Sequence, residues 1–180
     1  MTSSTADSVG ARQATLNLNG DLKIYSGTFI APPLGSGKGT IVFRRTGIQT
    51  VVSSISGNSF QGNLDYRIES SSTVSLGNSV LSNTTGMLHV KGKIQLGSSD
   101  PGGAIQLVNQ GNIYIPGPRI FEDESIVEYN GTSPQWIGDG HPSGSGITFI
   151  GNNPSEIALT QDVIADDFLV QQGTIRADLY

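Results

Sequence analysis

The side chains in this sequence that could do acid–base or metal chemistry are mainly carboxylates. They form two clusters about forty residues apart: Glu122, Asp123, Glu124, and then Asp162, Asp166 and Asp167. Ca²⁺ takes about six to eight oxygen ligands, which carboxylates can supply. The candidate calcium ligands are Glu122, Asp123, Glu124, Asp166 and Asp167. Neither cluster has the spacing of an EF-hand loop, and a solvated turn is the simpler interpretation of each. Paired carboxylates could also cleave a glycosidic bond, provided that the fold brings the clusters together.

The segment "APPLGSGKGT", residues 31–40, resembles the phosphate-binding loop of nucleotide kinases. That loop reads Gly-x-x-x-x-Gly-Lys-Ser/Thr and opens a helix whose amides hold phosphate. Here Pro32 stands where the first Gly is required, and Gly39 follows the Lys. The next residues, "IVFRR", are typical of a strand. We therefore interpret this segment as a Gly-rich turn between strands.

Three ring side chains, Tyr129, Trp136 and His141, are candidates for a surface recognition patch that could bind a sugar. The alternative for Trp136 is packing in the core. His89 and His141 are predicted to be exposed, and two distant His in a chain without Cys do not predict a metal centre. The sequence also lacks a Gly-x-Ser-x-Gly nucleophile elbow. We therefore predict no catalytic residues, no resident cofactor and no enzymatic activity.

The composition excludes several classes of partner. The 180 residues carry a net charge of −5, and no basic run that could bind nucleic acid or an anionic membrane surface is present. No apolar run is long enough to cross a bilayer, so we expect no membrane insertion. The absence of Cys removes disulfides and thiolate chemistry. Charged residues make up only 14%, which disfavours long solvent-exposed helices.

The elements that would position these residues are short strands. Apolar residues alternate around a Gly in three segments, 15–27, 86–98 and 167–178. This period of two predicts strands joined by Gly turns. The segment 158–173 also fits an amphipathic helix, but its counterpart 75–90 is too rich in Gly, Ser, Thr and Asn to form one. We therefore expect strands in both segments.

Two segments share an outline that suggests a diverged tandem repeat. "IVFRRTGIQTVVS" (residues 41–53) and "IVEYNGTSPQWIG" (126–138) both contain Ile-Val, an aromatic residue, a Gly, a Gln and a closing aliphatic residue. A unit of about 80 residues would contain three or four solenoid rungs. The predicted fold is all-β, a right-handed parallel β-helix of short strands, with an antiparallel β-sandwich as the alternative.

This repeat predicts an organisation in three parts. Residues 1–13 form a flexible segment, residues 14–97 the first copy, and residues 98–180 a second copy that continues beyond this sequence.

The second copy resembles repeats of large secreted and cell-surface proteins of Bacteroidetes-type bacteria. The matching segments are "VEYNGTSPQWI" and "IALTQDVIADDFLVQQGTI", and the match is looser over residues 41–96. The matching residues are Tyr129, Asn130, Gly131, Gln135, Asp162, Val163, Phe168, Val170 and Gly173. In the first copy Arg44 and Arg45 replace the Asn-Gly turn. The resemblance implies a β-solenoid adhesin that is exported to the cell surface.

These observations predict a non-catalytic structural or adhesive module of a large extracellular repeat protein, acting as a rigid stalk or filament segment. One alternative is a carbohydrate-binding or carbohydrate-active β-helix, which requires acidic and aromatic side chains on one outer face. A second alternative is a trimeric fibre or tailspike module. The expected partners are neighbouring repeats or identical subunits, with surface glycans as a further possibility.

Overall fold

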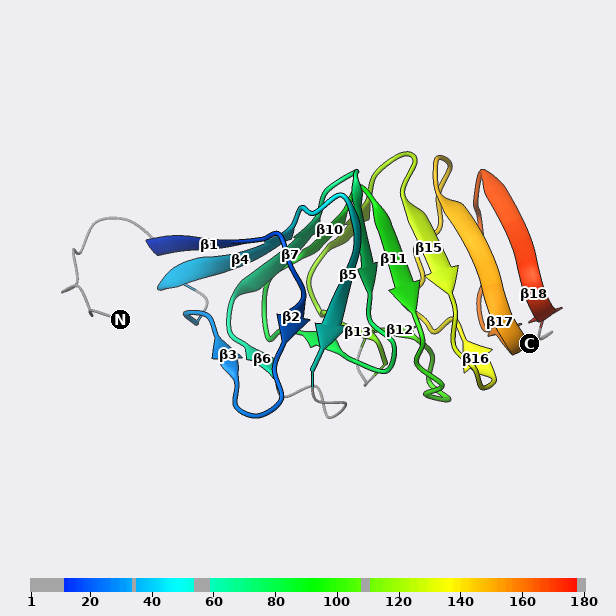
Figure 1. The fold of residues 1–180 in the computed structure, drawn as a ribbon, viewed down its shortest axis with the longest axis horizontal. Coiled ribbons are helices and arrows are strands. Elements are labelled where there is room, and N and C mark those ends of the chain that lie inside the picture. Colours follow the sequence, from blue (N-terminus) through cyan, green and yellow to red (C-terminus); the bar gives the residue numbers. More distant parts are fainter. Residues whose placement is uncertain (1–11, 34, 54–58, 108–110, 178–180) are drawn as a thin grey trace.

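A computed structural model describes residues 12–33, 35–53, 59–107 and 111–177 as a parallel β-helix (Figure 1). These residues form 18 strands and no helix. Strands from successive rungs pair in parallel, as β1 does with β4 and β15 with β17. The prediction of an all-β parallel solenoid is therefore confirmed, and the antiparallel sandwich is wrong. The described part also contains no helix long and apolar enough to cross a membrane.

The first side of the coil is one parallel sheet of five strands. In spatial order it contains β1 (Arg12–Leu18), β4 (Gly37–Phe43), β7 (Leu64–Ile68), β10 (Leu88–Val90) and β14 (Arg119–Phe121). Arg12 and Gln13 belong to β1, so this strand begins inside the segment that the sequence suggests is flexible. Residues 1–11 lie outside the described part of the chain.

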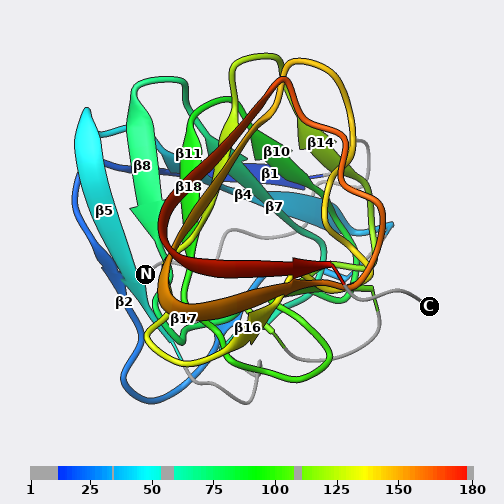
Figure 2. The ribbon, with the colours of Figure 1, turned by 90° about the vertical axis from the view of Figure 1, so that its right-hand side faces the viewer.

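The second side contributes one strand to each of seven rungs. It contains β2 (Leu22–Lys23), β5 (Gly47–Val52), β8 (Ser72–Ser75), β11 (Lys93–Leu96), β15 (Ile126–Tyr129), β17 (Thr148–Leu159) and β18 (Asp167–Ala177). β17 and β18 are long enough to turn the corner onto the third side (Figure 2). The segment 158–173, for which a helix was the alternative, therefore contains the end of β17 and the start of β18, as the repeat predicts.

The third side consists of very short strands. It contains β3 (Phe29–Ile30), β6 (Phe60–Gln61), β9 (Leu81–Ser82), β13 (Ile113–Tyr114), β12 (Ile105–Gln106) and β16 (Gln135–Trp136). β12 precedes β13 in sequence but lies farther along the axis, between β13 and the residues that follow β16. This side is continued by the ends of β17 and β18, since β16 pairs with Ile157 and Ala158.

The core is a set of inward-facing columns that run through the rungs. One column on the first side contains Ile41, Tyr66 and Leu88, which pair in register and are fully buried. Each side chain buried in this way contributes about 1.5–3 kcal/mol to stability. Lys93 of β11 pairs with Ile126 of β15, so the stack is continuous across residues 97–98, where the sequence suggests a junction between copies.

The two segments with the shared outline lie on different sides of the coil. Residues 41–43 belong to β4 on the first side, whereas residues 126–129 form β15 on the second side. An offset of about 85 residues is therefore not a whole number of turns. What the two segments share is a strand, a corner and a second strand.

The segment that resembles a phosphate loop leads directly into β4. Lys38 lies within that strand and forms an ion pair with Asp65 of β7, with 2.5 Å between Nζ and Oδ2. Because a strand follows the Gly residues, no helix N-terminus is available there to hold a phosphate. This placement agrees with the interpretation as a turn between strands.

Candidate functional site

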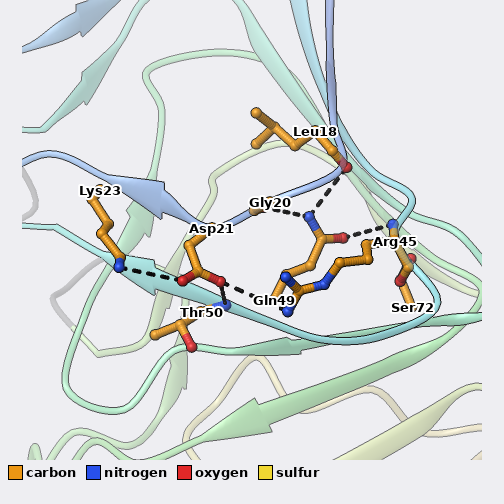
Figure 3. A network of polar contacts seen from close by, with 8 residues as sticks. All are labelled: Leu18, Gly20, Asp21, Lys23, Arg45, Gln49, Thr50 and Ser72. Carbon is orange, nitrogen blue, oxygen red and sulfur yellow. Dashed lines mark hydrogen bonds and ion pairs between the residues drawn. The ribbon is translucent and has the colours of Figure 1, made fainter.

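The shared Gln of the two similar segments is a buried corner residue. Gln49 donates from Nε2 to the carbonyl oxygens of Leu18 (3.1 Å) and Gly20 (2.6 Å), and its Oε1 accepts from the backbone N–H of Arg45 (Figure 3). These groups belong to the corner of the preceding rung and to the turn before β5. The amide therefore fastens one corner to the next and satisfies polar backbone groups that would otherwise be buried without partners.

Gln135 makes the same contacts at a different corner. Its Nε2 donates to the carbonyls of Leu96 (3.0 Å) and Ser98 (3.1 Å), and its Oε1 accepts from the N–H of Gly131 (2.7 Å). In both copies the accepted N–H lies four residues before the Gln. The pattern shared by the two segments therefore corresponds to the same local structure, although the two segments lie on different sides of the coil.

Other buried polar side chains extend this pattern. Asn112 Nδ2 donates to the carbonyls of Gly77 and Ser79, and the Ser72 hydroxyl, which has a single proton, lies 3.1 Å and 3.0 Å from the carbonyl oxygens of Phe43 and Arg45. Both side chains are essentially inaccessible to solvent. Asn112 and Ser72 were not predicted to be corner residues, because Asn and Ser beside Gly are also typical of exposed turns.

A second feature is an aromatic stack inside the C-terminal rungs. Tyr129 and Phe149 are fully buried, and Phe168, which is 45% exposed, continues the stack. The ring centroids are 5.2 Å apart for Tyr129 and Phe149 and 4.5 Å apart for Phe149 and Phe168. His141 packs edge-on against Phe149, and its Nδ1 lies 2.7 Å from the Tyr129 hydroxyl oxygen. Burial raises the pKa of Tyr129 well above its usual value, so the phenol stays protonated.

The predicted recognition patch is therefore not assembled on the surface. Tyr129 is fully buried and His141 is 6% exposed, so the expectation of an exposed His141 is wrong. Burial lowers the pKa of His141 to about 4, which keeps the ring neutral near pH 7. Trp136 is half-buried on β16, and in the described part of the chain it makes no ring contact with the other two. His89 is partly exposed and bonds to Glu122.

The two acidic clusters converge on one open groove of about 420 Å³, here named the acidic groove. It is lined by Asp123, Glu124, Ile126, Ser145, Gly146, Thr148, Asp166 and Asp167. Three successive turns, which precede β15, β17 and β18, supply these residues. Backbone hydrogen bonds join the turns, from Glu124 N to Gly146 O and from Asp166 N to Ile147 O.

The acidic groove gathers carboxylates without forming a metal site. Four of the five candidate calcium ligands line it, whereas Glu122 pairs with His89 and Lys91. Hydrogen bonds from His89 and then Lys91 lower the pKa of Glu122. No group of three or more His, Asp or Glu in the described ranges is close enough to hold a metal ion. Calcium binding stays a prediction that this arrangement does not strengthen.

A ladder of polar side chains follows the outer face of the second side. Glu128 is almost completely buried and accepts from Lys93, Gln95 and Asn152. Burial raises the pKa of its carboxyl, but these hydrogen bonds and the charge of Lys93 outweigh burial and lower it overall. The ladder fixes neighbouring rungs to one another.

Comparison with known proteins finds no matching family model, no matching curated protein and no matching solved structure.

Proposed function

We propose that this chain is a non-catalytic structural module that serves as a rigid stalk or filament segment of a large extracellular repeat protein. One observation carries the proposal: several buried polar side chains of the described residues join one rung to the next. Gln49, Gln135 and Asn112 each donate to two carbonyls of a neighbouring corner. A stack fastened at its corners resists bending and shear between rungs, which is what a spacer requires.

The location at a cell surface and the role in adhesion are part of this proposal. They rest on the sequence resemblance to secreted repeat proteins of Bacteroidetes-type bacteria. The trimeric fibre is the alternative assembly, and light scattering separates a trimer from a monomer or from a linear chain.

Rigidity is the property to test. The sequence has no Cys, so Tyr25→Cys and Thr132→Cys can carry two spin labels without background labelling. Both positions are exposed and lie in the first and fifth rungs, about 19 Å apart along the axis at one strand spacing per rung. Double electron–electron resonance spectroscopy on a dilute sample should give one narrow distribution of distances between the two spin labels. A broad distribution would refute the proposed role.

The carbohydrate-active alternative has one observation in its favour, the acidic groove. None of the described residues that line it is aromatic, and Tyr129 and His141 are buried. The chain should therefore release no reducing sugar from a panel of neutral and acidic polysaccharides. Release by the wild type that is lost on Asp123→Asn or Asp166→Asn would instead establish an enzyme.

A further inference from the structure

The sequence contains two Asn–Gly pairs, Asn19–Gly20 and Asn130–Gly131. At such a pair the backbone nitrogen of the Gly can attack the side-chain carbonyl carbon of the Asn, because Gly has no side chain that would hinder the approach. The attack requires a Gly N–H that is free to lose its proton and an Asn side chain that is free to turn toward it. The two pairs differ in both respects.

The Asn130–Gly131 pair is held in place by a corner amide. The N–H of Gly131 donates to Oε1 of Gln135 (2.7 Å), and the N–H of Asn130 donates to the carbonyl oxygen of Leu96 (2.9 Å). Gly131 is buried, and a Cβ added to it would lie 2.9 Å from the carbonyl oxygen of Gly97. Attack by the Gly131 nitrogen requires that a buried hydrogen bond break first, so this pair reacts only when the corner opens.

The Asn19–Gly20 pair lies in the bend between β1 and β2 and is not held in this way. Asn19 is exposed, and the N–H of Gly20 donates no hydrogen bond to any of the described residues. Apart from its two neighbours in the chain, no described residue has a heavy atom within 4 Å of the position that a Gly20 Cβ would occupy. The nitrogen and the side-chain carbonyl of this pair are therefore free to approach each other.

The carbonyl group of the same Gly20 helps to join the first rung to the second. Gln49 Nε2 donates to the carbonyl oxygens of Leu18 (3.1 Å) and Gly20 (2.6 Å), and Figure 3 shows the amide between them. Asn19 separates these two residues in the chain. The spacing of the two carbonyl groups therefore depends on the backbone of residue 19.

We propose that Asn19 is a site of intramolecular deamidation and that Gln135 protects Asn130 from the same reaction. The nitrogen of Gly20 loses its proton to hydroxide and forms a bond to Cγ of Asn19, the Cγ–Nδ2 bond breaks, and ammonia leaves. Water then opens the resulting cyclic imide at either of its carbonyl groups, which gives aspartate or isoaspartate and adds one negative charge. The reaction needs no enzyme, and this inference does not depend on the proposed function.

The isoaspartate product should disturb the corner that Gln49 binds. In isoaspartate the main chain passes through the side-chain carbons, so the carbonyl groups of Leu18 and Gly20 are separated by one additional backbone carbon. Gln49 then cannot bind both carbonyl oxygens at their present positions. Deamidation at Asn19 should therefore loosen the attachment between the first two rungs.

Peptide mapping by mass spectrometry tests which pair reacts. The folded wild type is incubated at mildly alkaline pH, and the fraction of each Asn whose NH2 group is replaced by OH is followed with time. Asn19 should convert at least about tenfold faster than Asn130, because the N–H of Gly131 must first leave a buried hydrogen bond. In concentrated urea, which abolishes the fold, the two pairs should convert at similar rates.

Gly20→Ala is the matched variant. Its Cβ would lie in open space, and Gly20 does not have a positive φ, so the variant should keep the fold. The added methyl group hinders attack by the backbone nitrogen. Conversion at Asn19 should therefore slow severalfold, whereas conversion at Asn130 should not change.

A second measurement tests the effect on the corner. Aged chains that contain isoaspartate at position 19 are separated by ion-exchange chromatography and unfolded with denaturant. They should unfold at a lower denaturant concentration than Asn19→Asp, which carries the same charge on an unaltered backbone.

Equal rates at the two pairs in the folded chain, or no conversion of Asn19 there, would overturn the assignment of the site. A difference that persists in urea would overturn the protection by Gln135, because neighbouring residues would then set the rates. Unchanged conversion in Gly20→Ala would exclude attack by the Gly20 nitrogen. Equal unfolding midpoints for the isoaspartate form and Asn19→Asp would refute the effect on the corner that Gln49 binds.

Discussion

Acidification should destabilise the C-terminal rungs through His141. This side chain is enclosed by Tyr129 and Phe149 and is only 6% exposed, and burial lowers its pKa to about 4. In the unfolded chain an imidazole titrates near pH 6.5. Between these two values the unfolded state binds a proton that the folded state does not bind, so the free energy of unfolding must fall as the pH is lowered.

The magnitude follows from the two pKa values. Each unit of difference corresponds to about 1.4 kcal/mol, and a depression from 6.5 to about 4 therefore gives about 3 kcal/mol. This contribution to stability is complete above pH 6.5. It decreases through the window from 6.5 to 4 and changes little below it. A loss of this size is a large fraction of the net stability of a typical domain.

Two measurements check this prediction. The chain contains only two His, so a nuclear magnetic resonance titration shows two imidazole signals, and His89→Gln identifies which one belongs to His141. The His141 signal should titrate at about pH 4. In denaturant unfolding, the wild type should lose about 3 kcal/mol more than His141→Phe between neutral pH and pH 4, since only the wild type carries this proton linkage.

The comparison with His141→Phe removes the contribution of carboxylates, which titrate in both proteins. A His141 signal that titrates near 6.5 would refute the reasoning. A difference between the two proteins that does not change with pH would refute it equally.

Substitutions at buried corner positions should lower the free energy of unfolding, whereas substitutions at exposed positions should change it little. Gln135→Ala should lower the free energy of unfolding by about 2–4 kcal/mol, because it leaves buried backbone groups without partners, whereas Gln172→Ala on the exposed strand β18 should change it by less than about 0.5 kcal/mol. Denaturant titration measures both, and equal effects would contradict the role of the corner amide. Gly117→Ala should cost about 3 kcal/mol or more, since its Cβ would lie 1.8 Å from the carbonyl oxygen of Gly86. Gly144→Ala, whose nearest neighbour would be 3.8 Å away, should be nearly neutral in the same assay.

Much of the fold could be predicted from the sequence because its signals are local. The alternation of apolar residues around Gly in segments such as 86–98 corresponds to β10 and β11, and the absence of helix-forming stretches is matched by the strands of the described residues. The recurring Gln of the two similar segments pointed to a shared unit, and Gln49 and Gln135 do make equivalent contacts.

The sites were predicted less well. Tyr129 and His141 suggested a surface patch. The alternation around Tyr129 does not show which face of its strand is inside, and His141 lies between β16 and β17, in a segment whose residue types do not show whether it is buried. The sequence also does not show whether the acidic clusters meet. Asp123 and Asp166 are separated by more than forty residues, and they come together only when successive turns stack.

By itself the sequence determined the secondary structure, the rung-like repetition and the absence of cysteine chemistry, since each depends on residue types and short spacings. Only the tertiary structure decided on which side of the coil each segment lies. Insertions between strands, such as the residues around β12, shift each segment by a variable length, so Ile41 and Ile126 come to lie on different sides. Which side chains are buried and which carboxylates meet both follow from the side of the coil on which each segment lies.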